Sequence, residues 1–312
     1  MSRPVTLIST VYQEADGIHE FLESIAAQTR RPDQVVITDA GSQDGTVEII
    51  RGFTGLPITL EVLPGANRSR GRNQAVARAE HDLIAAADAG CRLDPRWLEE
   101  ITRPFDLPEP PDVVAGYYRP DARTPFEQAV AAATIPAGEE VDENTFLPSG
   151  RSVAFTREAW AKVGGYPEWA TLSEDTLFDL ALRKAGCKFA FAPKAQALWR
   201  PQGSLGRVFR QFSRYAASDG EQGLWFGHYT KAYLWWGLVI WAAIFLPAAL
   251  ILLAGGYALR YVSRSRRRGA QGAAALLSVP VMLTVDLAHA LGYARGFLRR
   301  LRRGRPRPEA NP

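Results

Sequence analysis

The sequence predicts an α/β fold, with a mostly parallel sheet covered by helices on both faces, followed by C-terminal membrane helices. Two observations carry this prediction. Short β-rich runs alternate with helical patterns over residues 5–90, and such alternation is typical of a parallel sheet whose crossovers are helices. Residues 232–259 contain no charged side chain, which indicates a segment that enters a membrane.

The N-terminal elements follow from the spacing of apolar residues. The run "VTLISTV" at residues 5–11 predicts a strand, and the apolar residues within 18–25 lie on one face of a following helix. The elements expected next are the strand "QVVITD", the helix "TVEIIRGF", the strand "ITLEVL", a helix over 68–80 and the strand "DLIAAAD". Four strands separated by three helices are therefore expected in the first part of the chain.

The middle of the chain gives a less uniform pattern. Residues 104–145 are rich in Pro, Ala and acids, and we expect a less regular excursion there. Order is expected to return with a strand at "SVAF", helices from about Arg157 and Glu174, and a strand at "KFAFAP". We find no internal repeat.

The uncharged stretch at residues 232–259 gives the strongest physical signal in the sequence. As one helix it would extend about 42 Å, which exceeds the roughly 30 Å hydrocarbon core of a bilayer. Aromatic residues at both of its ends fit the belts that form at membrane interfaces. A second apolar segment, residues 270–294, carries Asp286 as its one full charge and is expected to span or to lie half-inserted.

The topology of these two segments stays open. Arginines fill the loop that joins them, and the tail beyond residue 294 is also basic. The positive-inside tendency favours the same side of the membrane for both, which a simple two-span hairpin forbids. Pro247 and the pair Gly255 and Gly256 would instead permit a re-entrant first segment.

The charge of the chain is unevenly distributed. Residues 260–312 contain twelve arginines and two acids, so this segment has a net charge of about +10, whereas the net charge of the whole chain is only +4. Few aromatics interleave with these arginines, so anionic lipid head groups are the expected partner and nucleic acid is not. Cys91 and Cys187 are expected to be reduced thiols, and no secretory signal is visible at the start.

Two acids are expected at the carboxyl ends of predicted strands, where open α/β sheets bind ligands. Asp39 opens "DAGSQDGT", and Asp88 ends "DLIAAAD"; Glu14 follows the first strand. Asp39 either accepts hydrogen bonds from a nucleobase or ribose, or it is only part of a turn and helix cap. The sequence leaves both alternatives open.

Two further clusters surround predicted helix starts. "GANRSRGRNQAVARA" brings Arg68, Arg70, Arg72 and Asn73 to a helix N-terminus, which suits a diphosphate, unless these residues only form a solvated face. In "SEDTLFDLALRKAG" the first turn holds Glu174 and Asp175. Such acids often complement the helix dipole, but a carboxylate there can also take a proton from an acceptor hydroxyl.

Taken in order, these clusters resemble the inverting glycosyltransferases of family 2, which have the GT-A fold. The resemblance covers about residues 4–215 and rests on "STVYQEAD", "ITDAGSQDGT", "GRNQA", "AADAG", "RSVAF…VGGYPEW" and "SEDTLFDLALRKAG". It implies an enzyme that transfers a sugar, hexose-like in kind, from a nucleoside-diphosphate-sugar to a hydroxyl.

The resemblance also implies the roles of individual residues. The donor would be bound by Glu14, Asp39, Arg72, Asn73 and Asp88, and the acceptor side would include Tyr166 and Trp169. Asp175 would be the general base, with Glu174 beside it as a second catalytic acid.

The chain departs from the family at Gly90. The family commonly has Asp-x-Asp, whose second Asp is a principal ligand of Mg²⁺ or Mn²⁺, and Gly90 offers no side-chain oxygen. Either Asp88 holds the divalent cation with diphosphate oxygens and waters, or the arginines neutralise the diphosphate instead. Asp94 is a further candidate ligand.

A second partial match is "QFSRY", which resembles the Gln-x-x-Arg-Trp motif of processive polysaccharide synthases. It makes Gln211, Arg214 and Tyr215 candidates for acceptor binding, because an aromatic ring can cover the apolar face of a sugar. The segment around it is either a core-packing helix or an amphipathic helix at the membrane surface.

We therefore expect a glycosyltransferase domain over residues 1–205, an interfacial connector over 206–230, membrane-embedded segments within 231–298 (about 232–260 and 270–294) and a basic tail over 299–312. The expected function is transfer to a lipid-linked or membrane-proximal saccharide acceptor of the cell envelope, at the cell membrane, with the catalytic domain in the cytosol. The alternatives are a processive polysaccharide synthase subunit and a non-catalytic nucleotide-binding membrane module.

Overall fold

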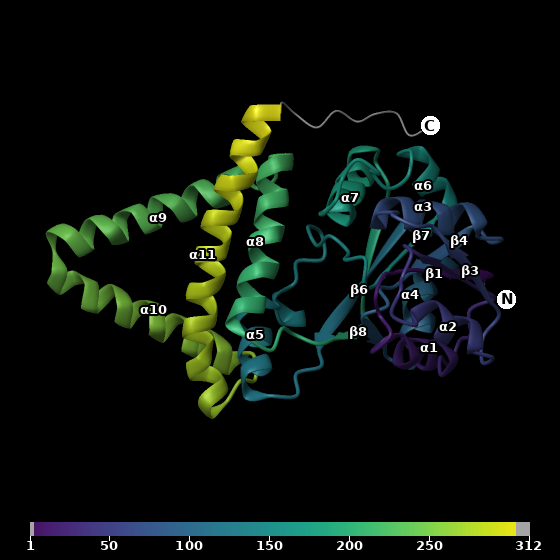
Figure 1. Ribbon diagram of the computed structural model, residues 1–312, viewed down its shortest axis with the longest axis horizontal. Coiled ribbons are helices and arrows are strands. Elements are labelled where there is room, and N and C mark those ends of the chain that lie inside the picture. Colours follow the sequence, from purple (N-terminus) through teal and green to yellow (C-terminus); the bar gives the residue numbers. More distant parts are fainter. Residues whose placement is uncertain (1–2, 304–312) are drawn as a thin grey trace. The chain divides into compact units, whose positions relative to one another are not determined.

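The strands and helices predicted over the first 86 residues are all present in the computed structural model, which describes residues 3–303. In order they are β1 (Val5–Val11), α1 (Ile18–Ala26), β2 (Gln34–Asp39), α2 (Thr46–Gly52), β3 (Ile58–Val62), α3 (Arg68–Arg78) and β4 (Leu83–Ala86). Within the described residues the chain divides into two units, one of residues 3–119 and 138–199 and one of residues 120–137 and 200–303. Figure 1 shows these elements, and each unit is described by itself.

The first unit continues with β5 (Cys91–Leu93), α4 (Trp97–Thr102), the 3-10 turn η1 (Arg103–Asp106), β6 (Val113–Pro120), the turn η2 (Gly138–Glu140), β7 (Val153–Thr156), α6 (Arg157–Lys162), α7 (Glu174–Lys184) and β8 (Phe189–Trp199). The expectation of an irregular excursion over residues 104–145 was wrong, because β6 and α5 (Pro125–Thr134) lie there. Helix α5 begins with a reciprocal capping box between Thr124 and Glu127. That signal is present in the sequence but is obscured by the surrounding prolines.

The eight strands form one sheet in the order β3-β2-β1-β4-β7-β6-β8-β5. Strand β1 runs parallel to β2 and β4, and β2 runs parallel to β3, whereas β7 is antiparallel to both β4 and β6. The predicted mostly parallel sheet is therefore a mixed sheet. The prediction rested on strand–helix alternation, which extends only through β4. For strands β1–β4 the predicted parallel arrangement is correct.

Helices cover both faces of this sheet, as predicted. Alternate residues of β1 and β2 point to opposite faces, so that Leu7 and Ile37 join one buried cluster and Ile8 and Val36 join the other. Helix α1 buries its apolar face in the first cluster, and α3, α6 and α7 contribute to the second. The two cysteines are free thiols, Cys91 being buried.

Helix α3 lies unusually close to the carboxyl ends of β1 and β2. A Cβ atom on Gly71 would stand 2.8 Å from Cγ2 of Thr10 and 3.0 Å from Oγ1 of Thr38. Glycine therefore permits the approach, which holds the next residue of the helix, Arg72, over the ends of the parallel strands.

The second unit contains α5, α8 (Leu205–Gln222), α9 (Phe226–Phe245), α10 (Pro247–Arg267) and α11 (Gly272–Arg303). Figure 1 shows α8 and α11 side by side, with α9 and α10 projecting away from them as a hairpin. Residues 232–259 do not form one helix, because the chain leaves helical geometry at Leu246 and resumes at Pro247, one of the positions that the sequence left open for a break. Proline supplies no backbone N–H to continue the first helix.

Within the described part of the chain, one helix is long and apolar enough to cross a membrane by length and composition. It is residues 272–302 of α11, which contain most of the second predicted segment.

Gly71→Ala should destabilise the protein. In open space the substitution would favour a helix by up to about 1 kcal/mol, but overpacking against Thr10 and Thr38 should cost about 1–3 kcal/mol. Gly52→Ala is the matched control, because nothing lies within 4 Å of a Cβ at the end of α2. Thermal unfolding of the full-length protein in detergent measures both, and equal midpoints for the two variants would contradict the packing argument.

Candidate active site

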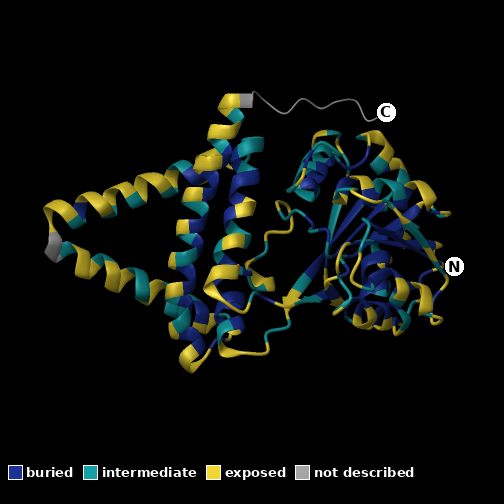
Figure 2. Cartoon of the chain, viewed as in Figure 1, coloured by how far each residue is buried: buried dark blue, intermediate teal, exposed yellow. Residues whose placement is uncertain are grey.

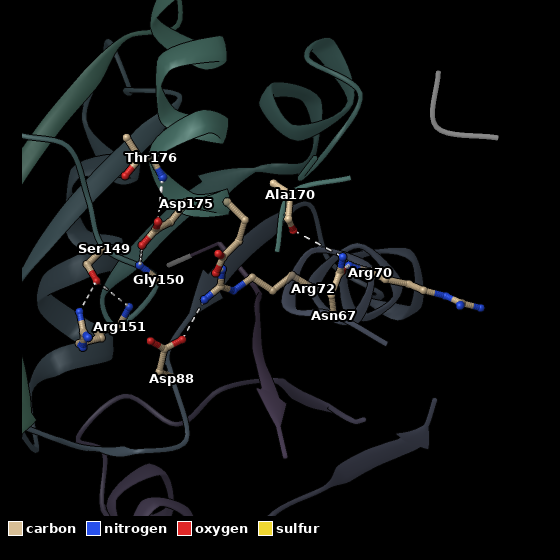
Figure 3. Close-up of polar contacts among 11 residues, drawn as sticks. Asn67, Arg70, Arg72, Asp88, Ser149, Gly150, Arg151, Ala170, Asp175 and Thr176 are labelled. Carbon is tan, nitrogen blue, oxygen red and sulfur yellow. Dashed lines mark hydrogen bonds and ion pairs between the residues drawn. The ribbon is translucent and has the colours of Figure 1, made fainter. Parts of the chain in front are cut away.

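A buried arginine joins three segments of the first unit. Arg72 on α3 donates from Nη1 to Oε1 of Glu174 and from Nη2 to Oδ1 of Asp88, both at 2.9 Å. Its side chain is 4% exposed and its guanidinium lies 5.3 Å from the centre of the Tyr166 ring. Figure 3 shows Arg72 directed from α3 towards Asp88. Arg72 is thus fixed in one position.

This ion-pair network keeps Asp88 ionised. Burial opposes the charged form, but the guanidinium of Arg72, followed by those of Arg151 and Arg68, holds the pKa of Asp88 below its ordinary value. The same pairing raises the pKa of Arg72 despite its burial. Asp88 therefore carries a negative charge at the end of the strand that leads to it, as the sequence indicated.

The two acids at the start of α7 occupy different environments. Glu174 is buried and forms an ion pair with Arg72. Asp175 is half-buried; its Oδ2 accepts from the Gly150 amide at 3.3 Å and its Oδ1 accepts from the Thr176 amide at 2.8 Å, as Figure 3 shows. Of the two predicted catalytic acids, Asp175 is the one not held in an ion pair with Arg72.

Gly150 lets the chain pass directly over the arginine. A Cβ atom at this position would overlap the guanidinium of Arg72. Because the Gly150 amide also binds Asp175, this one residue connects the ion-pair network to the candidate base.

Sequence reasoning missed two residues of this cluster. Arg151 stacks its guanidinium 4.8 Å from the centre of the Trp199 ring, and its charge lowers the pKa of Asp88. Asp179 lies one turn after Asp175 and is 2% exposed; burial, followed by the charge of Asp175, raises its pKa well above the ordinary value. The motif "RSVAF" and the i+4 spacing of the two acids were the available signals.

Glu14 lies beside the position where the family has its second aspartate. A Cβ atom on Gly90 would stand 3.8 Å from Oε1 of Glu14. Burial raises the pKa of Glu14, and the negative charge of Asp88 is the next largest cause. The carboxylates of Glu14 and Asp88 are therefore close enough to repel each other. Asp94, in contrast, accepts from the Arg96 amide at 3.1 Å and caps the turn before α4.

Asp39 has the predicted turn role, and its role towards a nucleobase or ribose stays a prediction. Its Oδ1 accepts from the amides of Gly41 and Ser42 at 2.8 Å, which shapes the turn after β2. Its Oδ2 is buried and has no hydrogen-bond partner among the described residues. A buried carboxylate oxygen without a donor is costly, so this atom suits a ligand that brings its own N–H or O–H group.

Asn73 and Tyr166 belong to the scaffold of the site. The Asn73 amide donates to the carbonyl of Tyr166 and to Oε1 of Glu168, and its Oδ1 accepts from Trp160 and Tyr166. The Tyr166 ring is 1% exposed and stacks on Phe178 with ring centres 4.0 Å apart. Both residues hold the loop around Trp169, which is itself half-buried. Asn73 stays a predicted donor-binding residue, and Tyr166 and Trp169 stay predicted acceptor-binding residues.

The three candidate acceptor-binding residues within "QFSRY" lie on α8 in the second unit. Gln211 donates from Nε2 to the hydroxyl of Tyr215 at 3.0 Å, and Tyr215 is 38% exposed. Gln211, Arg214 and Tyr215 stay predicted acceptor-binding residues.

Comparison with known proteins assigns the family. A sequence profile described as "Glycosyl transferase family 2" matches residues 6–157, and one described as "Glycosyl transferase family group 2" matches residues 132–289, about half of the chain. The chain belongs to glycosyltransferase family 2. The first profile spans Glu14, Asp39, Arg72 and Asp88 of the site.

Individual relatives agree with this assignment. The chain is 33% identical over 100 residues to "Glycosyltransferase AglE" of Haloferax volcanii, covering 30% of this chain and 33% of the relative. It is 30% identical over 220 residues to "Succinoglycan biosynthesis protein ExoA" of Rhizobium meliloti, covering 65% and 64%. The chain thus spans between a third and two thirds of these curated relatives.

A solved structure confirms the fold. The mannosyltransferase PcManGT from Pyrobaculum calidifontis, in complex with GDP-Man and Mn²⁺, is similar with a TM-score of 0.62 at 19% identity, covering 93% of this chain and 87% of that one. The expected GT-A type of α/β fold is therefore present.

Arg72→Met should destabilise the protein severely. Removing the cation leaves Glu174 buried without its charge partner, and breaking a buried pair in this way costs about 3–5 kcal/mol. Arg70→Met is the control, because Arg70 is exposed on the same helix. Chemical unfolding of the full-length protein in detergent measures the difference; equal stability of the two variants would refute the structural role of the network.

Proposed function

We propose that this protein is an inverting glycosyltransferase that moves a sugar from a nucleoside-diphosphate donor to a hydroxyl of a lipid-linked or membrane-proximal saccharide. The observation that carries the proposal is the position of Asp175. It is a half-buried carboxylate held by the Gly150 amide, next to a network in which Arg72 already engages Glu174 and Asp88. Asp175 is therefore the acid of this pair that we assign to the acceptor hydroxyl.

The proposed reaction is a single displacement. The acceptor oxygen attacks the anomeric carbon on the face opposite the donor phosphate, and Asp175 takes the hydroxyl proton as the new C–O bond forms. The bond from the anomeric carbon to the phosphate oxygen breaks, and the nucleoside diphosphate leaves with its electron pair. Glu174 acts in this scheme as a positioning residue, through Arg72.

Donor binding is supported by unsatisfied and cationic groups. The buried Oδ2 of Asp39 suits a donor group on the base or ribose. Arg68 lies in the first turn of α3, where free backbone amides add to its charge, and Arg151 lies near Asp88. These groups suit a diphosphate.

A divalent cation fits this site only when it is shared with the donor. Among the described residues, no group of three or more His, Cys, Asp or Glu is placed to hold a metal. Mg²⁺ is often bound by one or two carboxylates together with substrate phosphates, and Asp88 with Glu14 supplies two. When bound, such a cation offsets the charge of the diphosphate leaving group.

Nucleotide and metal should therefore bind together. In calorimetric titrations with UDP, GDP and dTDP, one nucleotide should bind at least tenfold more tightly with Mn²⁺ than without it. Glu14→Gln should remove most of this enhancement, whereas Glu48→Gln, an exposed acid on α2, should not. An equal Mn²⁺ effect in both variants would exclude Glu14 as a ligand, and metal-independent binding would favour the arginines.

Asp175→Asn should abolish turnover while nucleotide affinity stays unchanged. General base catalysis contributes about 10²–10⁴-fold, and the amide oxygen of Asn can still accept from Gly150, so the loss should appear in kcat. Asp106→Asn, an exposed acid, is the control. Steady-state transfer to a lipid-extracted acceptor gives the readout, and full activity of Asp175→Asn would remove this residue from the base role.

The second candidate is a processive polysaccharide synthase subunit, which the Gln211–Tyr215 pair on α8 favours. Product length separates the two candidates. A single added sugar would indicate the first, and a series of products of increasing length would indicate the second. A non-catalytic module would bind nucleotide and release no diphosphate.

We further propose attachment to the cell membrane, with the donor site in the cytosol and anionic lipids as partners. The support comes from the apolar length of α11, from the exposed apolar surface of the second unit and from the arginines after residue 259.

A further inference from the structure

Between residues 233 and 259, helices α9 and α10 expose many large apolar side chains. Figure 2 shows both arms of the hairpin as largely exposed. Ile251 and Leu252, in the arm that follows Leu246, are the most exposed of these residues, at 75% and 78%. The others include Leu234, Leu238, Ile240, Trp241, Ile244, Phe245 and Leu259. A surface of this extent requires a partner.

The arms are too short to cross a bilayer separately. The apolar part of α9 runs from residue 232 to residue 245 and that of α10 from residue 247 to residue 259. At 1.5 Å per residue each arm extends about 20 Å, against a hydrocarbon core of about 30 Å. A hairpin with arms of this length therefore ends short of the opposite head groups.

Polar and aromatic groups mark the base of the hairpin, opposite the turn. Tyr233 donates to the carbonyl of Ala290 at 2.7 Å, and Tyr257 donates to Oδ2 of Asp286 at 2.8 Å, both on α11. Asp286 thereby has the partner that an acid near a membrane requires. Beyond Tyr257 the charge is positive, with five arginines between residues 260 and 268. This charge complements anionic head groups.

Helix α11 packs along α8, which is a polar helix. Added Cβ atoms on its Gly292 and Gly296 would overlap the backbone of α8, which shows how closely the two helices pack. Helix α8 carries five charged residues (Arg207, Arg210, Arg214, Asp219 and Glu221), so a spanning α11 would pull them towards the hydrocarbon. Exposed leucines recur on α11 at 276, 283, 287, 291 and 298, which places them on one face. That pattern suits a helix lying at the membrane surface.

We propose that α9 and α10 insert turn-first into one leaflet of an anionic bilayer and return to the side from which they entered, while α8 and α11 lie at the surface. The proposal rests on the membrane attachment inferred above but not on the transferase reaction. The partner surface is the lipid itself: acyl chains around the turn and acidic head groups around the arginines.

Fluorescence of the turn tests this placement. Leu252→Cys, in a full-length protein carrying Cys91→Ala and Cys187→Ala, is labelled with an environment-sensitive nitrobenzoxadiazole probe. Leu107→Cys is the matched control, because Leu107 is 57% exposed in the first unit. The labelled protein is added to vesicles of phosphatidylcholine and phosphatidylglycerol. Quenchers are placed outside the vesicles, inside them or on the lipid acyl chains.

The expected result is that only acyl-chain quenchers reach the probe at position 252, and that only the outer quencher reaches position 107. Quenching of position 252 from the lumen would overturn the proposal, because the arm would then cross. Quenching from outside would overturn it as well, and so would a blue shift without lipid, which would indicate a second copy of the chain as the partner.

A binding assay gives an independent readout. The double change Ile251→Asp and Leu252→Asp should reduce flotation with these vesicles at least tenfold, while Leu107→Asp should not. Flotation of the double variant like that of the parent would overturn the proposal. Sugar transfer enters neither assay, so an inactive protein with a lipid-buried turn would refute the proposed reaction and leave the hairpin standing.

Discussion

The candidate site depends on one buried cation that two carboxylates share. A guanidinium that is 4% exposed is stable there only because Asp88 and Glu174 both accept from it at 2.9 Å. These acids come from the loop after β4 and from the start of α7, so the bridge fixes three segments of the first unit together. Gly150 completes the arrangement by leaving room for the arginine and by holding Asp175 through its amide.

This arrangement changes the meaning of the missing aspartate at position 90. Asp88 is not an isolated acid, since its Oδ1 is already paired with Arg72. Glu14 lies where a side chain at position 90 would point, so the lost oxygen has a nearby substitute. The pair is too sparse to hold a cation alone, which is why the proposed cation is shared with the diphosphate of the donor.

The sequence predicted what depends on local pattern and missed what depends on distant pairing. Strands β1–β4 and the acids at their ends follow from periodicity, whereas the antiparallel direction of β7 is decided by its contacts with β4 and β6. Arg72 was placed near the donor, but its partner Glu174 lies 102 residues away. Glu174 and Asp175 are adjacent and chemically alike, so only the burial of Glu174 and its ion pair with Arg72 distinguish the positioning acid from the candidate base.

The apolar segment at residues 232–259 shows the same limit of local pattern. Its break also bears on the conflict between a two-span hairpin and the positive-inside tendency. An uncharged run of residues reports apolar length, but a break at Leu246 and Pro247 divides that length into two arms. A spanning first segment would have placed the arginines after residue 259 and the start of α9 on opposite sides of the membrane. If the hairpin returns to its own side and α11 does not cross, every described residue outside the bilayer faces one compartment. The positive-inside tendency is then satisfied both for the loop after residue 259 and for the basic C-terminal tail. Both would lie in the compartment proposed for the donor site.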